Sequence, residues 1–389
     1  MTFGGDPAPI EGCRILGIET SCDETAAAVV EWSDGAPRVR SNAVSTQHEL
    51  HERYAGVVPE LASRAHLERI VPTVQAALDE AGCTLDRLDA VAVGNRPGLI
   101  GSLLVGNAAA KAYAWGLGIP VIGIDHVAAH LAAGLMDAPP PEWPALGLVV
   151  SGGHTHLFRM DGPLDVMLLG RTIDDAIGEA FDKAATILGL GYPGGPKLDA
   201  RSDRGDPAAM RFPQPRLTAR SLRRGDASGE CTDGTDPNAR TLDFSFSGMK
   251  TALLYAVRGV PPVPGRPAPP PPAPLTERRV DDLCASFQAA AVAQLIDVLE
   301  RAIERDRTHG AVPARTLLVG GGVSANRHLR AEIERFGTRH GLTVRLPQRA
   351  YCLDNAAMIA ALAHWRMARG ERDDLRLAPS ARSTIGRSP

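Results

Sequence analysis

The residues GIETSCDET at 17–25 open the pattern that decides the fold. Two further glycine-rich turns follow far along the chain, VSGGHT at 150–155 and GGGVSAN at 320–326. Each turn comes after a short apolar run that is typical of a strand. Glycine lets the backbone approach a ligand closely and present its N–H groups to phosphate oxygens. One such turn could be no more than a turn, but three of them predict two lobes that close on one nucleotide.

Composition limits the class of protein. The chain has 389 residues, enough for about two domains, and a net charge of −3 that gives no general basic field for nucleic acid. The six cysteines form no C-x-x-C pair, which argues against a zinc ribbon and against a secreted disulfide scaffold. The N-terminus lacks the features of a signal peptide, and no apolar stretch reaches membrane length. We therefore expect a soluble cytoplasmic protein without membrane contact.

Strands and helices alternate along the chain, which predicts an α/β fold. The expected elements are two strands within 14–32, a helix over 57–81 with a kink or break at Pro72, a strand over 88–93, a helix over 102–115 and a strand over 121–124. The pattern restarts near Ala145 after a proline-rich break. We expect a first lobe over 14–142, a second lobe over 143–355, and a C-terminal helix over 356–377 that returns to the first lobe.

Three segments have compositions that favour disorder. Residues 217–240 are rich in Arg, Asp, Gly, Ser and Thr, and residues 258–274 are rich in proline. Neither segment can bury enough apolar surface to offset the entropy lost on ordering. We expect both to be disordered surface inserts, and residues 378–389 to be a flexible tail.

A histidine pair indicates a metal site. His126 and His130 are spaced i and i+4, so on a helix they share one face and can hold one ion. Val127 stands where the H-E-x-x-H motif has its glutamate, so the water-activating base of that motif is absent. Asp354 is the best candidate for a third ligand. The alternatives are helix capping for Asp354 and ordinary packing for the histidines.

A second group of polar residues falls within 173–199. Asp175, Glu179 and Asp182 have helical spacing and should share a face, either as a solvated row or against a bound cation. A glycine-rich turn over 189–196 then permits close backbone approach, and Asp199 follows it. The segment 244–250 is expected to be a strand and a turn, with a solvated lysine as its simplest interpretation.

Taken together, these segments resemble the universal tRNA N6-adenosine threonylcarbamoyltransferase family. The resemblance runs in the family's order over nearly the whole chain. The segments that carry it are GIETSCDET (17–25), GVVPELASRAH (56–66), GNRPGLIG (94–101), HVAAH (126–130), SGGHT (151–155), GEAFDK (178–183), YPGGP (192–196), FSFSGMK (244–250) and GGGVSAN (320–326).

The resemblance implies a two-lobed actin/Hsp70-like ATPase fold with a nucleotide cleft between the lobes. It implies transfer of a threonylcarbamoyl group from threonylcarbamoyl-adenylate to N6 of the adenosine 3′-adjacent to the anticodon, in tRNAs reading codons that begin with A. It also implies three protein partners of the reaction: a paralogous subunit, a small ATPase, and a separate enzyme that makes the adenylate. The family commonly has an acid at position 128, where this chain has alanine; that acid is not expected to bind the metal.

The resemblance also assigns roles to residues. His126, His130 and Asp354 would bind one divalent metal, typically iron. The donor's phosphate or acyl part would lie against Val149, Val150, Ser151, Gly152 and Gly153. Asp182, Gly195 and Asp199 would hold the ribose, and Asn326 would lie near the adenine or the phosphate on the metal side.

The donor is an activated mixed anhydride, so an amine nucleophile needs orientation more than a strong base. A metal could polarise the carbamoyl carbonyl, and backbone N–H groups in 151–153 could stabilise developing negative charge. No Ser-His-Asp or Cys-His pairing is evident, and no residue is assigned as a general base. The alternatives from other classes are a metallopeptidase and a non-catalytic nucleotide-binding scaffold.

Overall fold

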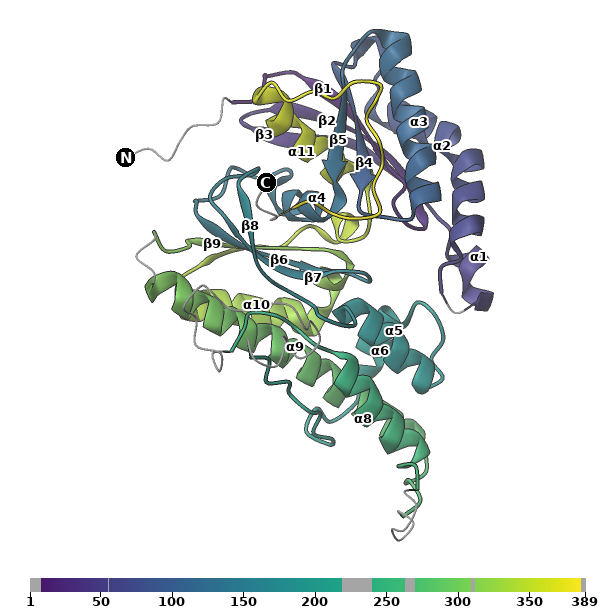
Figure 1. The fold of residues 1–389 in the computed structure, drawn as a ribbon, viewed down its shortest axis with the longest axis vertical. Coiled ribbons are helices and arrows are strands. Elements are labelled where there is room, and N and C mark those ends of the chain that lie inside the picture. Colours follow the sequence, from purple (N-terminus) through teal and green to yellow (C-terminus); the bar gives the residue numbers. More distant parts are fainter. Residues whose placement is uncertain (1–7, 55, 219–239, 263–269, 309–311, 386–389) are drawn as a thin grey trace, which may run out of the picture.

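The computed structural model describes residues 8–54, 56–218, 240–262, 270–308 and 312–385. It contains two five-stranded sheets, one above the other in Figure 1. The first sheet consists of β1 Arg14–Glu19, β2 Glu24–Ser33, β3 Ala36–Thr46, β4 Ala90–Arg96 and β5 Val121–Asp125. The second consists of β6 Ala145–Val150, β7 Thr155–Met160, β8 Val166–Arg171, β9 Thr316–Gly320 and β10 Thr343–Arg345.

The two sheets repeat one topology. The first has the order β3-β2-β1-β4-β5 and the second the order β8-β7-β6-β9-β10. In each, three strands form an antiparallel meander, and two further strands join it in parallel. Parallel pairing requires long crossover connections, which the helices between these strands supply. The predicted α/β fold with two lobes is confirmed.

The helices cover the sheets and connect their strands. They are α1 His48–His51, α2 Pro59–Ala81, α3 Ile100–Leu117, α4 His126–Ala132, α5 Ile177–Ile187, α6 Gly194–Ser202, α8 Ser247–Arg258, α9 Glu277–Thr308, α10 Arg327–His340 and α11 Ala356–Ala368. Short 3₁₀ turns lie at Glu52–Tyr54, Leu85–Arg87, Ala133–Leu135, Gly322–Ala325 and Arg349–Tyr351. The helix α4 lies between the two sheets (Figure 1).

Alternation along β1 explains how its sheet is covered on both faces. Successive side chains of a strand point to opposite faces. Leu16 and Ile18 join the apolar cluster of α2 and α3, whereas Ile15 joins the cluster of α11. Gly17 lies against α11, and a Cβ there would collide with the carbonyl oxygen of Ala356. This glycine of the first turn therefore serves helix packing rather than a ligand.

A large apolar core on the helix-covered face of its sheet holds the second lobe together. The long helix α9 contributes Phe287, which lies near Phe181 of α5 and Phe212. By length and apolar composition α9 could span a membrane, but 67% of its apolar window is buried inside the structure. Burial of this kind is what a core helix of a lobe requires.

Two expected elements differ in the structure. The helix α2 continues through Pro72 without a break, starting at Pro59 and ending before Gly82, which has φ +57°. The prediction of a strand and turn over 244–250 is wrong from residue 247 onward, because α8 begins at Ser247. Asp174 accepts hydrogen bonds from the Ser247 N–H at 3.3 Å and hydroxyl at 2.7 Å. Asp174, which is distant in sequence, thus caps the start of α8.

The C-terminal segment also differs from its prediction. The helix α11 packs against β1 and β2 but ends at Ala368 rather than 377, since Gly370 adopts φ +75°. The following residues are bonded to the first lobe: the Ser380 N–H donates to the Asn95 carbonyl at 2.9 Å, and the Ser383 hydroxyl donates to Asp125 at 2.6 Å. Residues of the expected flexible tail are thus in contact with the first lobe.

The expected inserts fall largely outside the described residues, which exclude 219–239 and 263–269. At the borders of the first one, Thr218 and Arg240 form an antiparallel bridge. The chain therefore leaves and re-enters the second lobe at neighbouring points.

Candidate metal centre and donor-binding residues

The strand β5 delivers the histidine pair to the space between the sheets. Asp125, the last residue of β5, caps α4 by accepting hydrogen bonds from the N–H groups of Val127 at 3.0 Å and Ala128 at 3.4 Å. His126 and His130 then lie one turn apart, with ring centroids separated by 4.6 Å. Both are buried. Because β9 ends against α4, a Cβ at Gly320 would collide with the carbonyl of His130.

Asp354 meets the two histidines from a distant part of the chain. Its Oδ1 lies 3.4 Å from Nε2 of His126 and 3.3 Å from Nε2 of His130. The alternative role as a helix cap falls to Asn355, whose Oδ1 accepts the N–H of Met358 at 3.0 Å. The carboxylate of Asp354 is therefore available to a ligand.

The geometry of the three side chains suits metal coordination better than hydrogen bonding among themselves. Neither ring nitrogen of the fully buried His130 has a hydrogen-bond partner among the described residues, so its approach to Asp354 is not a hydrogen bond. One ligand atom from each of the three residues lies within 4.8 Å of the others. Metal–ligand bonds of about 2.1 Å would separate neighbouring ligands by roughly 3.0–3.4 Å, close to the observed distances. Two imidazoles and one carboxylate suit iron or zinc.

Glu19 supports the pair from behind, and the sequence analysis did not assign it. Its Oε2 lies 3.0 Å from Nδ1 of His126, and its Oε1 accepts the N–H of Ser21 at 2.5 Å. A carboxylate on Nδ1 fixes the tautomer that presents Nε2 to a metal. Burial lowers the pKa of His126, but Asp354 and Glu19 outweigh it and raise that pKa well above its usual value. Metal binding must therefore displace a proton.

The turn at 151–153 offers two backbone donors rather than three. The Ser151 N–H is already bonded to the His154 carbonyl at 2.8 Å. The N–H groups of Gly152 and Gly153 make no hydrogen bond among the described residues, and a Cβ on either would meet nothing within 4 Å. These two N–H groups are therefore not engaged by the protein and can donate to an anion.

The remaining residues of this segment contribute backbone alone. Val149 and Val150 are fully buried, in the core clusters on opposite faces of β6. After the turn, burial and the neighbouring His126 and His156 together lower the pKa of His154 to about 3. His154 is therefore a neutral imidazole close to the metal ligands, and the turn and the histidine pair lie in one region.

Asp182 is tied to the turn that precedes α6. Its Oδ1 accepts the N–H of Gly194 at 2.8 Å and the N–H of Gly195 at 3.3 Å. Burial is the main cause that raises its pKa, against these two hydrogen bonds. Asp182 therefore shapes the turn with one oxygen.

The predicted row of acids on α5 does not form. Asp175 lies before the helix, which begins at Ile177. The cation of this group is internal: Lys183 bonds Asp175 at 2.5 Å and Glu179 at 3.0 Å. Lys183 thus engages one oxygen of each acid, while Oδ2 of Asp175 has no hydrogen-bond partner among the described residues.

Asn326 and Asp199 lie together on the second lobe. Asn326 caps α10 through the Leu329 N–H at 2.9 Å, and its amide donates to Gln288 at 2.7 Å and to Asp199 at 3.3 Å. Asp199 also pairs with Arg327 at 2.9 Å. The polar atoms of this pair are thus engaged within the protein.

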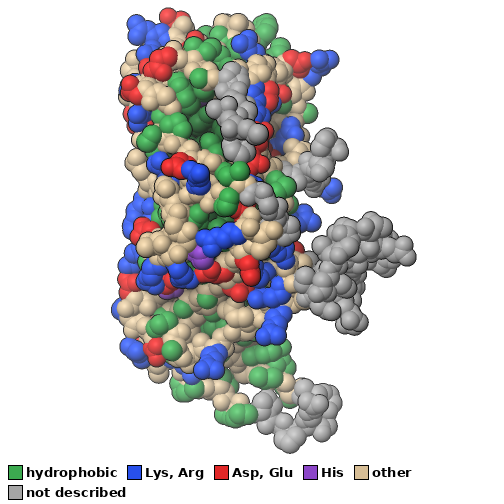
Figure 2. All heavy atoms as spheres, turned by 90° about the vertical axis from the view of Figure 1, so that its left-hand side faces the viewer, with side chains coloured by type: hydrophobic (Ala, Val, Ile, Leu, Met, Phe, Trp, Pro, Cys, Tyr) green, Lys and Arg blue, Asp and Glu red, His purple; other side chains and the backbone are tan. Residues whose placement is uncertain are grey.

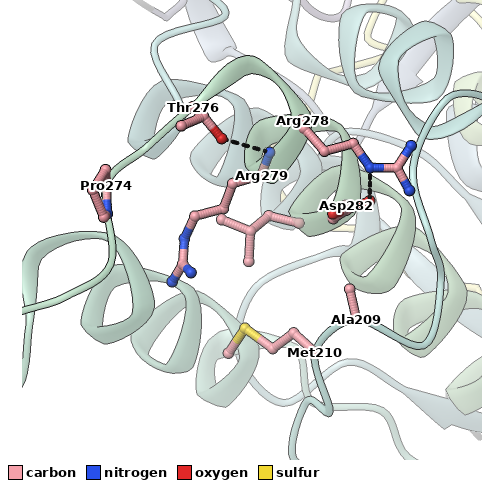
Figure 3. A pocket seen from close by; sticks show the side chains of 8 residues that line it. Ala209, Met210, Pro274, Thr276, Arg278, Arg279 and Asp282 are labelled. Atoms are coloured by element: carbon pink, nitrogen blue, oxygen red, sulfur yellow. Dashed lines mark hydrogen bonds and ion pairs between the residues drawn. The ribbon is translucent and has the colours of Figure 1, made fainter.

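A cavity of about 470 Å³ lies elsewhere, at the start of α9. In Figure 3 its polar groups are engaged within the protein: the Arg278 side chain bonds Asp282 at 3.1 Å, and the Thr276 hydroxyl accepts the backbone N–H of Arg279 at 3.3 Å. It contains none of the residues predicted to bind the metal or the donor.

The fold and the buried ligand set define a class: a two-lobed protein of the actin/Hsp70-like ATPase fold with a candidate metal centre between its lobes. The fold likeness includes HypF of T. kodakarensis, with a TM-score of 0.52 at 14% identity over 94% of this chain and 49% of that one. That likeness concerns the fold alone.

Sequence comparison narrows the class. The family model for tRNA N6-adenosine threonylcarbamoyltransferase matches residues 38–361. Proteins of that name from Trichlorobacter lovleyi and Anaeromyxobacter dehalogenans are 44% and 46% identical, over 94% and 95% of this chain and 95% and 99% of theirs. The chain belongs to the tRNA N6-adenosine threonylcarbamoyltransferase family, as the sequence motifs predicted.

Proposed function

We propose that this chain transfers a threonylcarbamoyl group from threonylcarbamoyl-adenylate to N6 of the adenosine 3′-adjacent to the anticodon, in tRNAs reading codons that begin with A. Family membership supports tRNA threonylcarbamoylation directly. The observation that carries the site is the meeting of three ligand side chains, including the unpartnered His130, in the region of two free backbone N–H groups. The metallopeptidase and scaffold alternatives lose their ground, since Val127 replaces the motif glutamate and the relatives are transferases.

His126, His130 and Asp354 would hold one divalent metal, and we propose Fe²⁺. Such an ion supplies Lewis-acid polarisation of the carbamoyl carbonyl. Glu19 would keep the proton on Nδ1 of His126, so that Nε2 stays a ligand. The metal ligands would therefore already be oriented before the donor binds.

The donor would be oriented by the second lobe. The N–H groups of Gly152 and Gly153 would face its phosphate or the developing oxyanion, because they alone in this turn are unengaged. The second carboxylate oxygen of Asp182, together with Gly195, Asp199 and Asn326, would contact the nucleoside. The amine needs alignment more than a base, since the donor is already activated.

Partner subunits belong to the proposal as well. Leu67 and Val71 on α2 are 66% and 60% exposed, and Ile100 and Leu104 on the adjoining α3 are 49% and 53% exposed. The helices that carry these four residues, the α2–α3 apolar surface, lie on the outer side of the first lobe (Figure 1). Large apolar side chains grouped on an outer face mark a protein interface. We propose that the paralogous subunit docks here, and that the small ATPase joins this complex.

The charge distribution gives the chain little ability to bind tRNA by itself. Lys and Arg are interspersed with Asp and Glu on the face in Figure 2, and the net charge is −3. The sequence has two small clusters of arginines. In one of them, Arg327 and Arg330, the guanidinium of Arg327 is neutralised by Asp199 and Asp203 at 2.9 and 2.5 Å. The other cluster, Arg220, Arg223 and Arg224, lies outside the described residues. Unaided tRNA binding usually requires several unpaired cations, so partners should supply part of that surface. A cytoplasmic location follows from the substrate.

The test is an in-vitro transfer assay with donor, unmodified tRNA and nucleoside mass spectrometry. The isolated chain should turn over slowly, and the complex with the paralogous subunit and ATPase should turn over many times. Leu67→Glu should abolish the gain from the partner, whereas Leu375→Glu, at a residue 52% exposed but outside the α2–α3 surface, should not. Absence of threonylcarbamoyladenosine with the complete complex would refute the function.

A further inference from the structure

A second cluster of potential ligands lies at the start of β2, apart from the histidine pair. It consists of Asp23, Glu24 and His48. One ligand atom from each lies within 4.8 Å of the others. The antiparallel pairing of β2 with β3 sets Glu24 opposite Thr46, which brings the start of α1 alongside. His48 Nε2 then lies 3.4 Å from Glu24 Oε1.

The cluster has an unsatisfied oxygen. Asp23 is 6% exposed and Glu24 is 8% exposed. Asp23 Oδ2 is buried and has no hydrogen-bond partner among the described residues. Burying two neighbouring carboxylates is costly unless a positive charge compensates them. In the part of the chain that the structure describes, neither forms an ion pair with a lysine or arginine, and the one ion pair of His48 is with Glu24.

The cluster also faces the second lobe. The ring of Tyr192 lies edge-on to His48, with ring centroids 6.2 Å apart. Asp23 is close enough to contribute to the raised pKa values of both Tyr192 and Asp182. The His48 side chain is 37% exposed, so the group can be reached from solvent. An ion there would lie where the two lobes approach each other.

We propose that Asp23, Glu24 and His48 form a second divalent-cation site, separate from the site of His126, His130 and Asp354. Two carboxylates and one imidazole form a harder ligand set than two imidazoles and one carboxylate, and oxygen donors favour Mn²⁺ and Mg²⁺. Three protein ligands leave open positions for water. The cation would neutralise the buried acids. It would also give Oδ2 of Asp23, which has no hydrogen-bond partner among the described residues, an atom to bind.

Mn²⁺ titration of the chelator-treated full chain, followed by electron paramagnetic resonance, tests the assignment. The wild-type chain should bind two Mn²⁺ ions. The His126→Ala, His130→Ala variant should keep one of them, and adding Asp23→Asn to it should weaken the remaining ion by more than about tenfold. Asp182→Asn in the same background is the matched control, because it removes a nearby negative charge without removing a ligand. It should keep the ion.

A structural role of the cluster predicts other results. If the two carboxylates merely share a proton, the double-histidine variant binds no Mn²⁺, and the proposal is overturned. Equal losses in Asp23→Asn and Asp182→Asn would overturn it too, since general electrostatics would then explain the binding. Should Asp23→Asn fail to fold by circular dichroism, His48→Gln at the more exposed ligand gives the same test. Retention of full Mn²⁺ affinity in that variant would count against the site.

Discussion

The metal centre and the predicted donor-binding residues of the second lobe differ in the hydrogen bonds that their polar atoms already make within the protein. His130 is fully buried, neither of its ring nitrogens makes a hydrogen bond among the described residues, and Asp354 is released from capping by its neighbour Asn355. Asp182 and Asn326, by contrast, hold the backbone of their own lobe. An unsatisfied buried group is expensive and indicates a ligand, whereas a satisfied one can be structural, functional or both. The comparison therefore separates residues whose removal costs binding alone from residues whose removal also costs stability.

The largest effect is expected from Asp354→Ala. Removing one of three protein ligands should lower metal affinity more than about 100-fold and abolish transfer, with little change in melting temperature. Asn355→Ala is the matched control, since loss of that cap should cost about 1 kcal/mol of stability and leave the metal bound. Elemental analysis and thermal melting measure both. Full metal content in Asp354→Ala would exclude this residue as a ligand.

A somewhat smaller loss is expected from Glu19→Gln. The substitution removes the negative charge that holds the proton on Nδ1 of His126. Metal affinity should therefore fall about 10- to 100-fold. Competition with a chromogenic chelator gives the affinity. Glu60→Gln, on an exposed i,i+4 pair, should leave it unchanged. Equal affinities for Glu19→Gln and the wild type would show that Glu19 does not orient the ligand.

Asp182 allows binding and architecture to be separated. Asp182→Asn keeps an oxygen for the N–H groups of Gly194 and Gly195 but removes the charge, so donor binding should weaken by about 1–3 kcal/mol while the melting temperature holds. Asp182→Ala should lower both. Calorimetry with a non-reactive donor analogue measures the affinity. Unchanged affinity in both variants would reduce Asp182 to a turn-forming residue.

The smallest effect is expected from Asn326. Asn326→Ala removes the cap of α10 and leaves Gln288 without its 2.7 Å partner, costing about 1–2 kcal/mol of stability. Asn326→Ser restores a capping oxygen and should recover about half of that loss. Urea denaturation measures it. If Asn326→Ser binds the donor analogue as tightly as the wild type does, Asn326 contributes the cap and no donor contact.

The fold class and the family that the sequence motifs predicted are confirmed, and the roles of the individual residues of both regions stay predictions. Their interactions were harder to predict, because the partners lie far apart in sequence. Glu19 is 107 positions from His126, so no local pattern connects this carboxylate with the histidines. In the same way, Asp174 caps α8 across 73 positions, and the strand expected over 244–250 gave way to a helix. Local patterns report backbone preference, and these contacts depend on how the elements pack.

The sequence by itself determined the periodic apolar patterns, the glycine turns and the ligand types, because these depend on side-chain chemistry and local backbone geometry. Only the tertiary structure decided which polar atoms remain free. It assigned the cap to Asn355 rather than Asp354, left two of the three N–H groups in 151–153 open, and closed Lys183 onto its own acids. Hydrogen-bond satisfaction is a property of the packed chain, since each donor takes whichever acceptor the fold brings to it.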